Sequence, residues 1–127
     1  MKLLVVEDSE MIRSRLLGLL AGIVGIESMD SAATLHQALA CARRDLPTLV
    51  LLDLHLPDGM ATGIIPALKA LSAAMQIAML TNDADAVTRN HCLRAGADWF
   101  FDKSTEIDAA IERVRQQAEL SLLIHHP

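Results

Sequence analysis

The chain has 127 residues and a formal net charge of −5, from 11 Lys+Arg against 16 Asp+Glu. Its length is typical of a single globular domain, and 52% hydrophobic with 21% charged residues exclude a disordered acidic tail. Aromatic residues make up only 2% of the chain and no basic patch is visible. Nucleic-acid binding relies on basic patches and stacking platforms, so we expect no direct nucleic-acid binding by this domain.

The sequence contains no signal for membrane insertion or secretion. No apolar run approaches the roughly 20 residues that a membrane-spanning helix needs. The N-terminal run Leu3–Val6 is too short for a signal peptide, and no cleavage site follows it. The two cysteines, Cys41 and Cys92, form neither a disulfide framework nor a metal-binding spacing. These observations predict a cytoplasmic domain without membrane contact.

The first third of the chain predicts two strands, each followed by a helix. Leu3–Val6 is a short apolar run, and Ser9 is a suitable N-cap for the helix that follows it. Residues 26–30 fit a second, weaker strand. Ser31 can cap the next helix, which Pro47 ends.

The middle of the chain contains the most apolar strand. Leu49–Leu52 is apolar at every position, which indicates burial on both faces, as in a central parallel strand. The turn-forming residues Leu56–Gly59 follow it. The next helix is expected from near Gly63, because Pro66 is tolerated only in a first helical turn.

The last third predicts two further strand–helix units. Ile77–Leu80 is the fourth apolar run, and the segment 82–95 after it is expected to be helical. Trp99–Phe101 is the fifth run, and Ser104 or Thr105 can cap the last helix.

Five strand–helix units in succession imply a parallel sheet with right-handed crossovers and helices on both faces. The chain is too short for an eightfold barrel, which needs about 250 residues. The predicted fold class is therefore α/β, with a doubly wound, five-stranded parallel sheet. In such sheets ligands bind beyond the carboxyl ends of the strands.

Polar residues stand at the ends of four predicted strands: Glu7 and Asp8, Asp53, Thr81, and Lys103. Each alone has an ordinary structural explanation, such as a favourable charge at a helix N-terminus, so the prediction depends on the whole set. Three neighbouring carboxylates repel one another unless a cation joins them, and an all-oxygen site suits Mg²⁺. A lysine and a hydroxyl can bind phosphate oxygens. The set predicts Mg²⁺-dependent phosphoryl transfer to a carboxylate.

Over essentially all of its length the chain resembles the receiver domains of two-component response regulators. The motifs that carry the resemblance are Val5–Ser9, Leu51–Gly59, Leu80-Thr81, Arg94–Asp98 and Phe101–Lys103. The resemblance implies a flavodoxin-like sheet with strand order 2-1-3-4-5. It also implies a receiver domain over residues 1–121, with a C-terminal tail or the start of a linker over 122–127.

For the acceptor and the metal, the resemblance implies specific roles. Asp53 accepts a phosphoryl group from a histidine kinase or a phosphotransfer protein. Asp8 binds Mg²⁺ directly and Glu7 binds it through water, and Asp53 and the main-chain carbonyl of His55 are further metal ligands.

The resemblance also implies a conformational switch. Lys103 pairs with the phosphoryl group, Thr81 hydrogen-bonds it after transfer, and Phe100 is the switch aromatic that turns inward. Two residues depart from the family pattern. Asn82 replaces a small residue and can slow access to the site, and Ser104 replaces the usual proline, which makes a cis peptide bond there improbable.

The function implied is a signalling receiver that catalyses its own phosphorylation and slow dephosphorylation, rather than a conventional enzyme. Its output is contact with an output protein, or with a second copy of itself, through the fourth helix, fifth strand and fifth helix. Three alternatives stay open. One is the receiver fragment of a multidomain transcriptional regulator, and another is a docking surface only. The third is an Mg²⁺-dependent aspartyl-phosphate phosphatase, which His55 disfavours because such enzymes carry an aspartate at that position.

Overall fold

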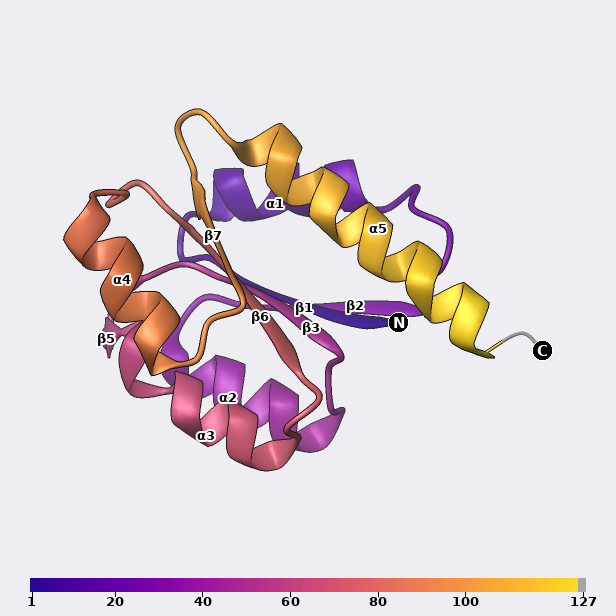
Figure 1. The fold of residues 1–127 in the computed structure, drawn as a ribbon, viewed down its shortest axis with the longest axis horizontal. Helices are drawn as coiled ribbons and strands as arrows, with labels where there is room; N and C mark the ends of the chain where they lie inside the picture. Colours follow the sequence, from indigo (N-terminus) through magenta and orange to yellow (C-terminus); the bar gives the residue numbers. More distant parts are fainter. Residues whose placement is uncertain (126–127) are drawn as a thin grey trace.

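The structure is a computed structural model that describes residues 1–125. Its centre is a five-stranded parallel sheet in the order β2-β1-β3-β6-β7 (Figure 1), which confirms the predicted order. The sheet strands are β1 (Lys2–Val6), β2 (Ser28–Ala32), β3 (Leu49–Leu52), β6 (Gln76–Thr81) and β7 (Trp99–Asp102). The helices are α1 (Glu10–Leu20), α2 (Leu35–Arg44), α3 (Ile65–Leu71), α4 (Ala86–Ala95) and α5 (Ile107–His125). A hairpin of β4 (His55–Leu56) and β5 (Gly59–Met60), then a 3-10 turn (Ala61–Gly63), follow β3.

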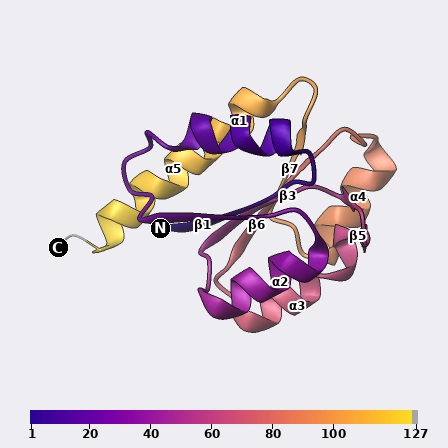
Figure 2. The same ribbon diagram turned by 180° about the vertical axis from the view of Figure 1, so that it is seen from behind.

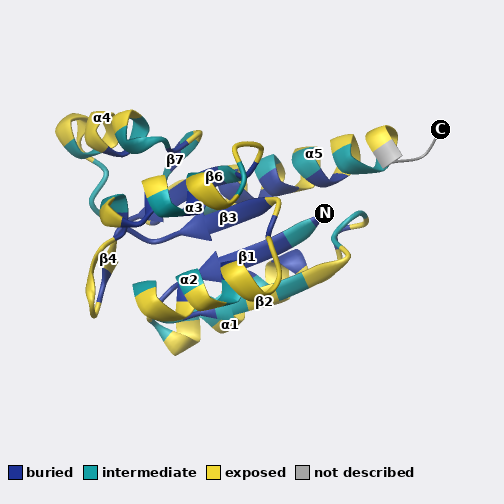
Figure 3. Ribbon diagram, turned by 90° about the horizontal axis from the view of Figure 1, so that it is seen from below, coloured by how far each residue is buried: buried dark blue, intermediate teal, exposed yellow. Residues whose placement is uncertain are grey.

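Helices cover both faces of the sheet: α1 and α5 lie on one face, and α2, α3 and α4 on the other (Figures 1 and 2). Alternate side chains of β1 therefore enter two separate cores. Leu3 and Val5 pack toward α1 and α5, whereas Leu4 and Val6 pack on the opposite side. All four residues of β3 are buried, as the uninterrupted apolar run predicts, and the central strands are the buried part of the molecule (Figure 3).

The second strand lies two residues later than predicted. Lys2 of β1 pairs with Ser28, so β2 covers Ser28–Ala32, and Ile26 lies in the loop that precedes it. Of the five residues of β2, Ala32 alone is buried, so this strand lacks the apolar run that marks the others. Ser31 is consequently a strand residue, and Thr34 caps α2 by accepting the N–H of Gln37 at 3.1 Å.

The fourth helix also begins later than predicted. Its first residue is Ala86, and Asp85 is its N-cap, with a carboxylate that accepts the N–H of Thr88 at 2.8 Å. Residues 82–84 remain outside the helix and form a loop at the end of β6. The prediction of a helix from residue 82 was wrong because several acceptor side chains follow one another here, and each is a suitable cap.

The predicted caps of the last helix were also wrong. Ser104 and Thr105 lie in the turn between β7 and α5, where the Asp102 carboxylate accepts the N–H of Ser104 at 2.9 Å. The helix α5 begins at Ile107 and continues without interruption to His125. Residues 126 and 127 of the predicted tail lie outside the described part of the chain. The helix α5 crosses residue 121, and a domain boundary at 121 stays a prediction.

The loop between α1 and β2 approaches α5 closely at Gly25. This glycine has a φ of +103°, and a Cβ there would lie 2.7 Å from the carbonyl oxygen of Ala118. We therefore expect Gly25→Ala to lower the free energy of unfolding by about 2 kcal/mol, measured by urea denaturation. Gly22→Ala is the matched control, because a Cβ there meets no atom within 4 Å. Equal losses in the two variants would contradict this close packing.

Candidate functional site

The main chain continues its hydrogen bonding past the ends of the sheet strands. The N–H groups of Glu7, Asp53 and Lys103, which follow β1, β3 and β7, each donate to a carbonyl of the neighbouring strand at 2.9 to 3.0 Å. These bonds fix the first residue beyond each strand at the same edge of the sheet. The structure therefore brings together residues that are up to 96 positions apart in sequence.

Four of the site residues named from the sequence are the buried polar residues of the described chain. Their exposed fractions are 2% for Glu7, 7% for Asp53, 1% for Thr81 and 9% for Lys103. Burying a charged side chain is unfavourable unless it is paired and hydrogen-bonded. The three charged side chains among them, Glu7, Asp53 and Lys103, must therefore be paired with one another or with other polar groups.

Lys103 supplies the partner for both buried carboxylates. Its Nζ donates to Glu7 Oε1 at 2.5 Å and to Asp53 Oδ2 at 2.9 Å. Burial raises the pKa of Glu7, against the opposing effect of the Lys103 hydrogen bond. Burial alone would lower the pKa of Lys103, but its hydrogen bonds to Glu7 and Asp53 and their charges outweigh this and raise it. The ammonium group is thus held in its charged form between the two carboxylates.

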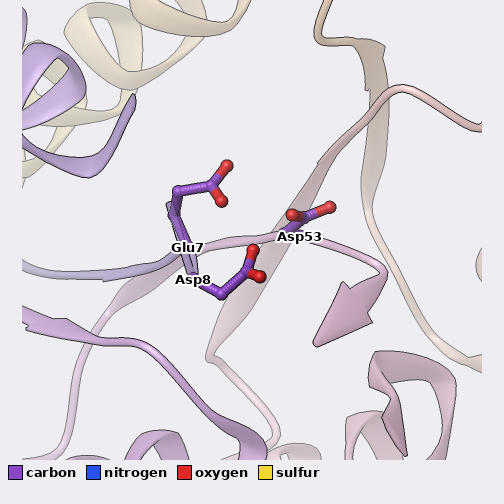
Figure 4. A group of neighbouring side chains, drawn as sticks. All are labelled: Glu7, Asp8 and Asp53. Atoms are coloured by element: carbon purple, nitrogen blue, oxygen red, sulfur yellow. The ribbon is translucent and has the colours of Figure 1, made fainter. Parts of the chain in front are cut away.

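A third carboxylate, Asp8, completes an acidic cluster at this edge. One oxygen each from Glu7, Asp8 and Asp53 can be chosen so that all lie within 4.8 Å of one another. The three side chains point toward a common space (Figure 4), and Asp8 is the exposed member. One lysine cannot balance three carboxylates, and a set of oxygen donors with an open side fits a hard cation that keeps some of its waters. The cluster could therefore hold a metal ion.

The turn that carries Glu7 and Asp8 is braced by a residue that sequence reasoning missed. Arg13, one turn into α1, donates from Nη1 to the carbonyl oxygen of Glu7 at 2.8 Å. The second carboxylate oxygen of Glu7 accepts the N–H of Ser9 at 3.0 Å. These contacts hold the Glu7 side chain toward Lys103.

The loop after β6 contains a second missed residue, Asp83. Its N–H donates to the hydroxyl oxygen of Thr81 at 3.2 Å, and its carboxylate lies 3.0 Å from the imidazole Nε2 of His55. Neighbouring Asn82 is exposed. His55 begins β4, two residues after Asp53, so its main-chain carbonyl stays only a predicted metal ligand.

The predicted switch aromatic, Phe100, is buried rather than exposed. Its side chain is 8% exposed and belongs to the core on the face covered by α2, α3 and α4. The neighbouring Trp99 packs on the opposite face, where the Arg113 guanidinium of α5 lies 5.1 Å from its ring centre. The structure thus holds Phe100 in an inward position, and its movement stays a prediction.

Comparison with known proteins establishes the family. The family model of the response regulator receiver domain matches residues 3–115, so the chain belongs to that family, as the sequence motifs indicate. A Pseudomonas aeruginosa protein named as a transcriptional regulator is 31% identical over 128 residues, which cover 99% of this chain and 59% of that relative. The chain thus spans less than two thirds of that relative's length.

Solved structures show the same fold. A CheY-like receiver domain protein from Methanospirillum hungatei has a TM-score of 0.81 and 24% identity, over 94% of each chain. A response regulator from Burkholderia pseudomallei with a phosphorylated aspartic acid, a calcium ion and citrate has a TM-score of 0.78 and 23% identity, over 99% of this chain and 75% of that one. Within residues 1–125, none of the helices is long and apolar enough to cross a membrane.

Proposed function

We propose that this receiver domain accepts a phosphoryl group on Asp53, from a histidine kinase or a phosphotransfer protein, in a reaction that requires Mg²⁺. The observation that carries the proposal is the contact of Lys103 with Asp53 inside a cluster of three carboxylates. A nucleophilic carboxylate beside a fixed ammonium group suits attack on a phosphoryl group, because the ammonium offsets charge on the phosphoryl oxygens.

In this mechanism a carboxylate oxygen of Asp53 forms the new bond to phosphorus while the bond from phosphorus to the donor breaks. With a phosphohistidine donor, the leaving group is an imidazole nitrogen, which retains the electron pair of the broken bond. Lys103 is already 2.9 Å from Asp53 and is placed to bind the transferred group. Thr81, which is buried at the end of the adjacent strand, supplies a hydroxyl for a further hydrogen bond.

For the metal, Asp8 and Asp53 are the proposed direct ligands, together with the main-chain carbonyl of His55, and Glu7 acts through water. When bound, Mg²⁺ neutralises carboxylate charge and orients phosphoryl oxygens. The phosphorylated aspartic acid and the calcium ion named for the Burkholderia pseudomallei neighbour support a reaction and a cation of this kind. The phosphatase alternative requires an aspartate two residues after Asp53. His55 occupies that position, which argues against a phosphatase.

The metal assignment predicts that Asp8→Asn weakens Mg²⁺ binding and stabilises the metal-free protein. Asp8→Asn removes a proposed direct ligand, so Mg²⁺ affinity measured by calorimetry should fall at least about tenfold. The same change removes one of three mutually repelling carboxylates, so the melting temperature of the metal-free protein should rise by a few degrees. Unchanged Mg²⁺ affinity would show that Asp8 is not a ligand.

Acetyl phosphate, a small phosphodonor, tests the proposed function without knowledge of the kinase. Incubation with Mg²⁺ should add one phosphoryl group to the protein, detected by intact mass spectrometry. The reaction should stop when the metal is chelated. No modification in the presence of Mg²⁺ would contradict the proposal.

The remaining parts of the proposal concern location and output. We infer a cytoplasmic protein whose phosphorylation changes the face formed by α4, β7 and α5. This face would then contact an output protein or a second copy of the chain. The relative named as a transcriptional regulator makes control of transcription a reasonable output for the whole protein.

A further inference from the structure

A hollow opens at the surface between the β4-β5 hairpin and α4. The hairpin and α4 lie at the same end of the sheet (Figure 1), and α4 packs against the 3-10 turn that follows the hairpin. The hollow has a volume of about 200 Å³. No aspartate, glutamate, lysine or arginine lines it. It is therefore separate from the acidic cluster, both in its residues and in its chemistry.

The floor of the hollow is apolar. Leu54, which directly follows Asp53, and Cys92 of α4 both line it, although each is 0% exposed. Burial raises the pKa of the Cys92 thiol, so the thiol stays in its neutral form. Apolar side chains that border an empty space lack packing partners on that side. A ligand that reached this floor would supply them.

Two large apolar side chains of the lining stand exposed to water. Met60 of the hairpin is 50% exposed and Val87 of α4 is 80% exposed. Covering apolar surface is favourable, and exposed apolar surface that adjoins a hollow is typical of a binding site. A molecule seated between the hairpin and α4 would cover both side chains.

We propose that this hollow binds a small neutral molecule with one aromatic ring system and one N–H or O–H donor. An engineered cavity of about 150 Å³ holds benzene, whereas pockets for drug-sized ligands measure about 300–1,000 Å³. A hollow of about 200 Å³ therefore suits a single ring system. A charged ligand would find no opposite charge in the lining. The inference does not depend on phosphorylation, because the acidic cluster takes no part in it.

The wall formed by α4 accounts for the donor group. The hydroxyl of Thr88, which lines the hollow, lies 3.4 Å from Asp83 Oδ1 and can donate to it. A hydroxyl that donates its proton keeps lone pairs that can accept a hydrogen bond. An N–H or O–H group on the ring can donate to this oxygen, which would orient the ligand between the apolar floor and α4.

Indole is the probe for the test, since it is neutral, aromatic and carries one N–H. It is titrated into the isotope-labelled chain, and two-dimensional NMR follows the methyl groups of Leu54 and Val87. These signals should shift with a dissociation constant of about 1 mM. Benzoate, a ring of similar size with a negative charge, should bind at least about tenfold more weakly.

Two variants locate the site. Thr62→Phe places a covalently attached ring at the hollow, so indole should bind at least about tenfold more weakly. Thr88→Val removes the proposed acceptor but keeps the side-chain shape, so binding should weaken about two- to tenfold. Thr105→Phe is the matched control, because it makes the same change at an exposed threonine outside the hollow and should leave the affinity unchanged.

Circular dichroism checks that the variants fold, and Thr88→Val tests the site even if Thr62→Phe does not. The site is overturned if Leu54 and Val87 show no saturable shift, or if the largest shifts fall on Leu120 and Ile124, which line a different hollow. It is also overturned if both Thr62→Phe and Thr88→Val bind indole as the control does. Benzoate binding as tight as that of indole would overturn the assignment of a neutral ligand.

Discussion

Replacing Asp53 with asparagine should reduce phosphoryl labelling by acetyl phosphate to background. The amide has nearly the shape of the carboxylate but lacks the nucleophilic oxygen that forms the new bond. The fold should persist, since Lys103 remains paired with Glu7. Labelling is measured by intact mass spectrometry in the presence of Mg²⁺, alongside circular dichroism as a check on folding.

The control for Asp53→Asn is Asp45→Asn, which makes the same chemical change at an exposed carboxylate paired with Lys2. Its labelling rate should match that of the unmutated protein. Labelling of Asp53→Asn at the rate of this control would show that another residue accepts the phosphoryl group.

Replacing Lys103 with methionine should give the largest loss of stability at the site. Lys103 is the partner of two buried carboxylates, and its removal leaves Glu7 and Asp53 facing each other without a cation. Removing one member of a buried ion pair typically costs about 3–5 kcal/mol. We expect a decrease of about 3 kcal/mol in the free energy of unfolding without Mg²⁺. Mg²⁺ should restore part of it by supplying positive charge.

A second substitution separates charge from packing in the Lys103→Met variant. Glu7→Gln added to it removes one unpaired buried charge, so the double variant should be more stable than Lys103→Met alone. Urea denaturation measures both. If Lys103→Met costs less than about 1 kcal/mol, a value typical of exposed pairs, the buried ion pairs are not formed in solution.

The core of the site could be predicted because it depends only on strand ends. Buried parallel strands are marked by apolar runs, and the first polar residue after each run lies at the same edge of the sheet. Glu7 and Asp53 follow this rule directly, Lys103 is the second polar residue after its run, and the structure brings the three side chains together. Thr81 ends β6 and is buried at the same edge.

The contacts of Asp83 and Arg13 could not be predicted in this way. Asp83 meets His55 across 28 positions of sequence, through a hairpin and a loop whose paths no local pattern specifies. Arg13 is one of three charged residues of α1, and no sequence pattern distinguishes the half-buried one that bonds the Glu7 carbonyl from the two exposed ones. The bounds of β2 were misplaced because its residues Ser28–Ala32 contain no apolar run to locate it, unlike the other edge strand, β7.

The most direct test of the central claim is to locate the phosphoryl group in the unmutated protein. After labelling with acetyl phosphate and Mg²⁺, borohydride reduces an aspartyl phosphate to homoserine, and peptide mass spectrometry finds the position of the reduced residue. We predict homoserine at position 53 alone. Reduction at another carboxylate, such as Asp8, or stable phosphate on His55, would contradict the assignment of Asp53 as the acceptor.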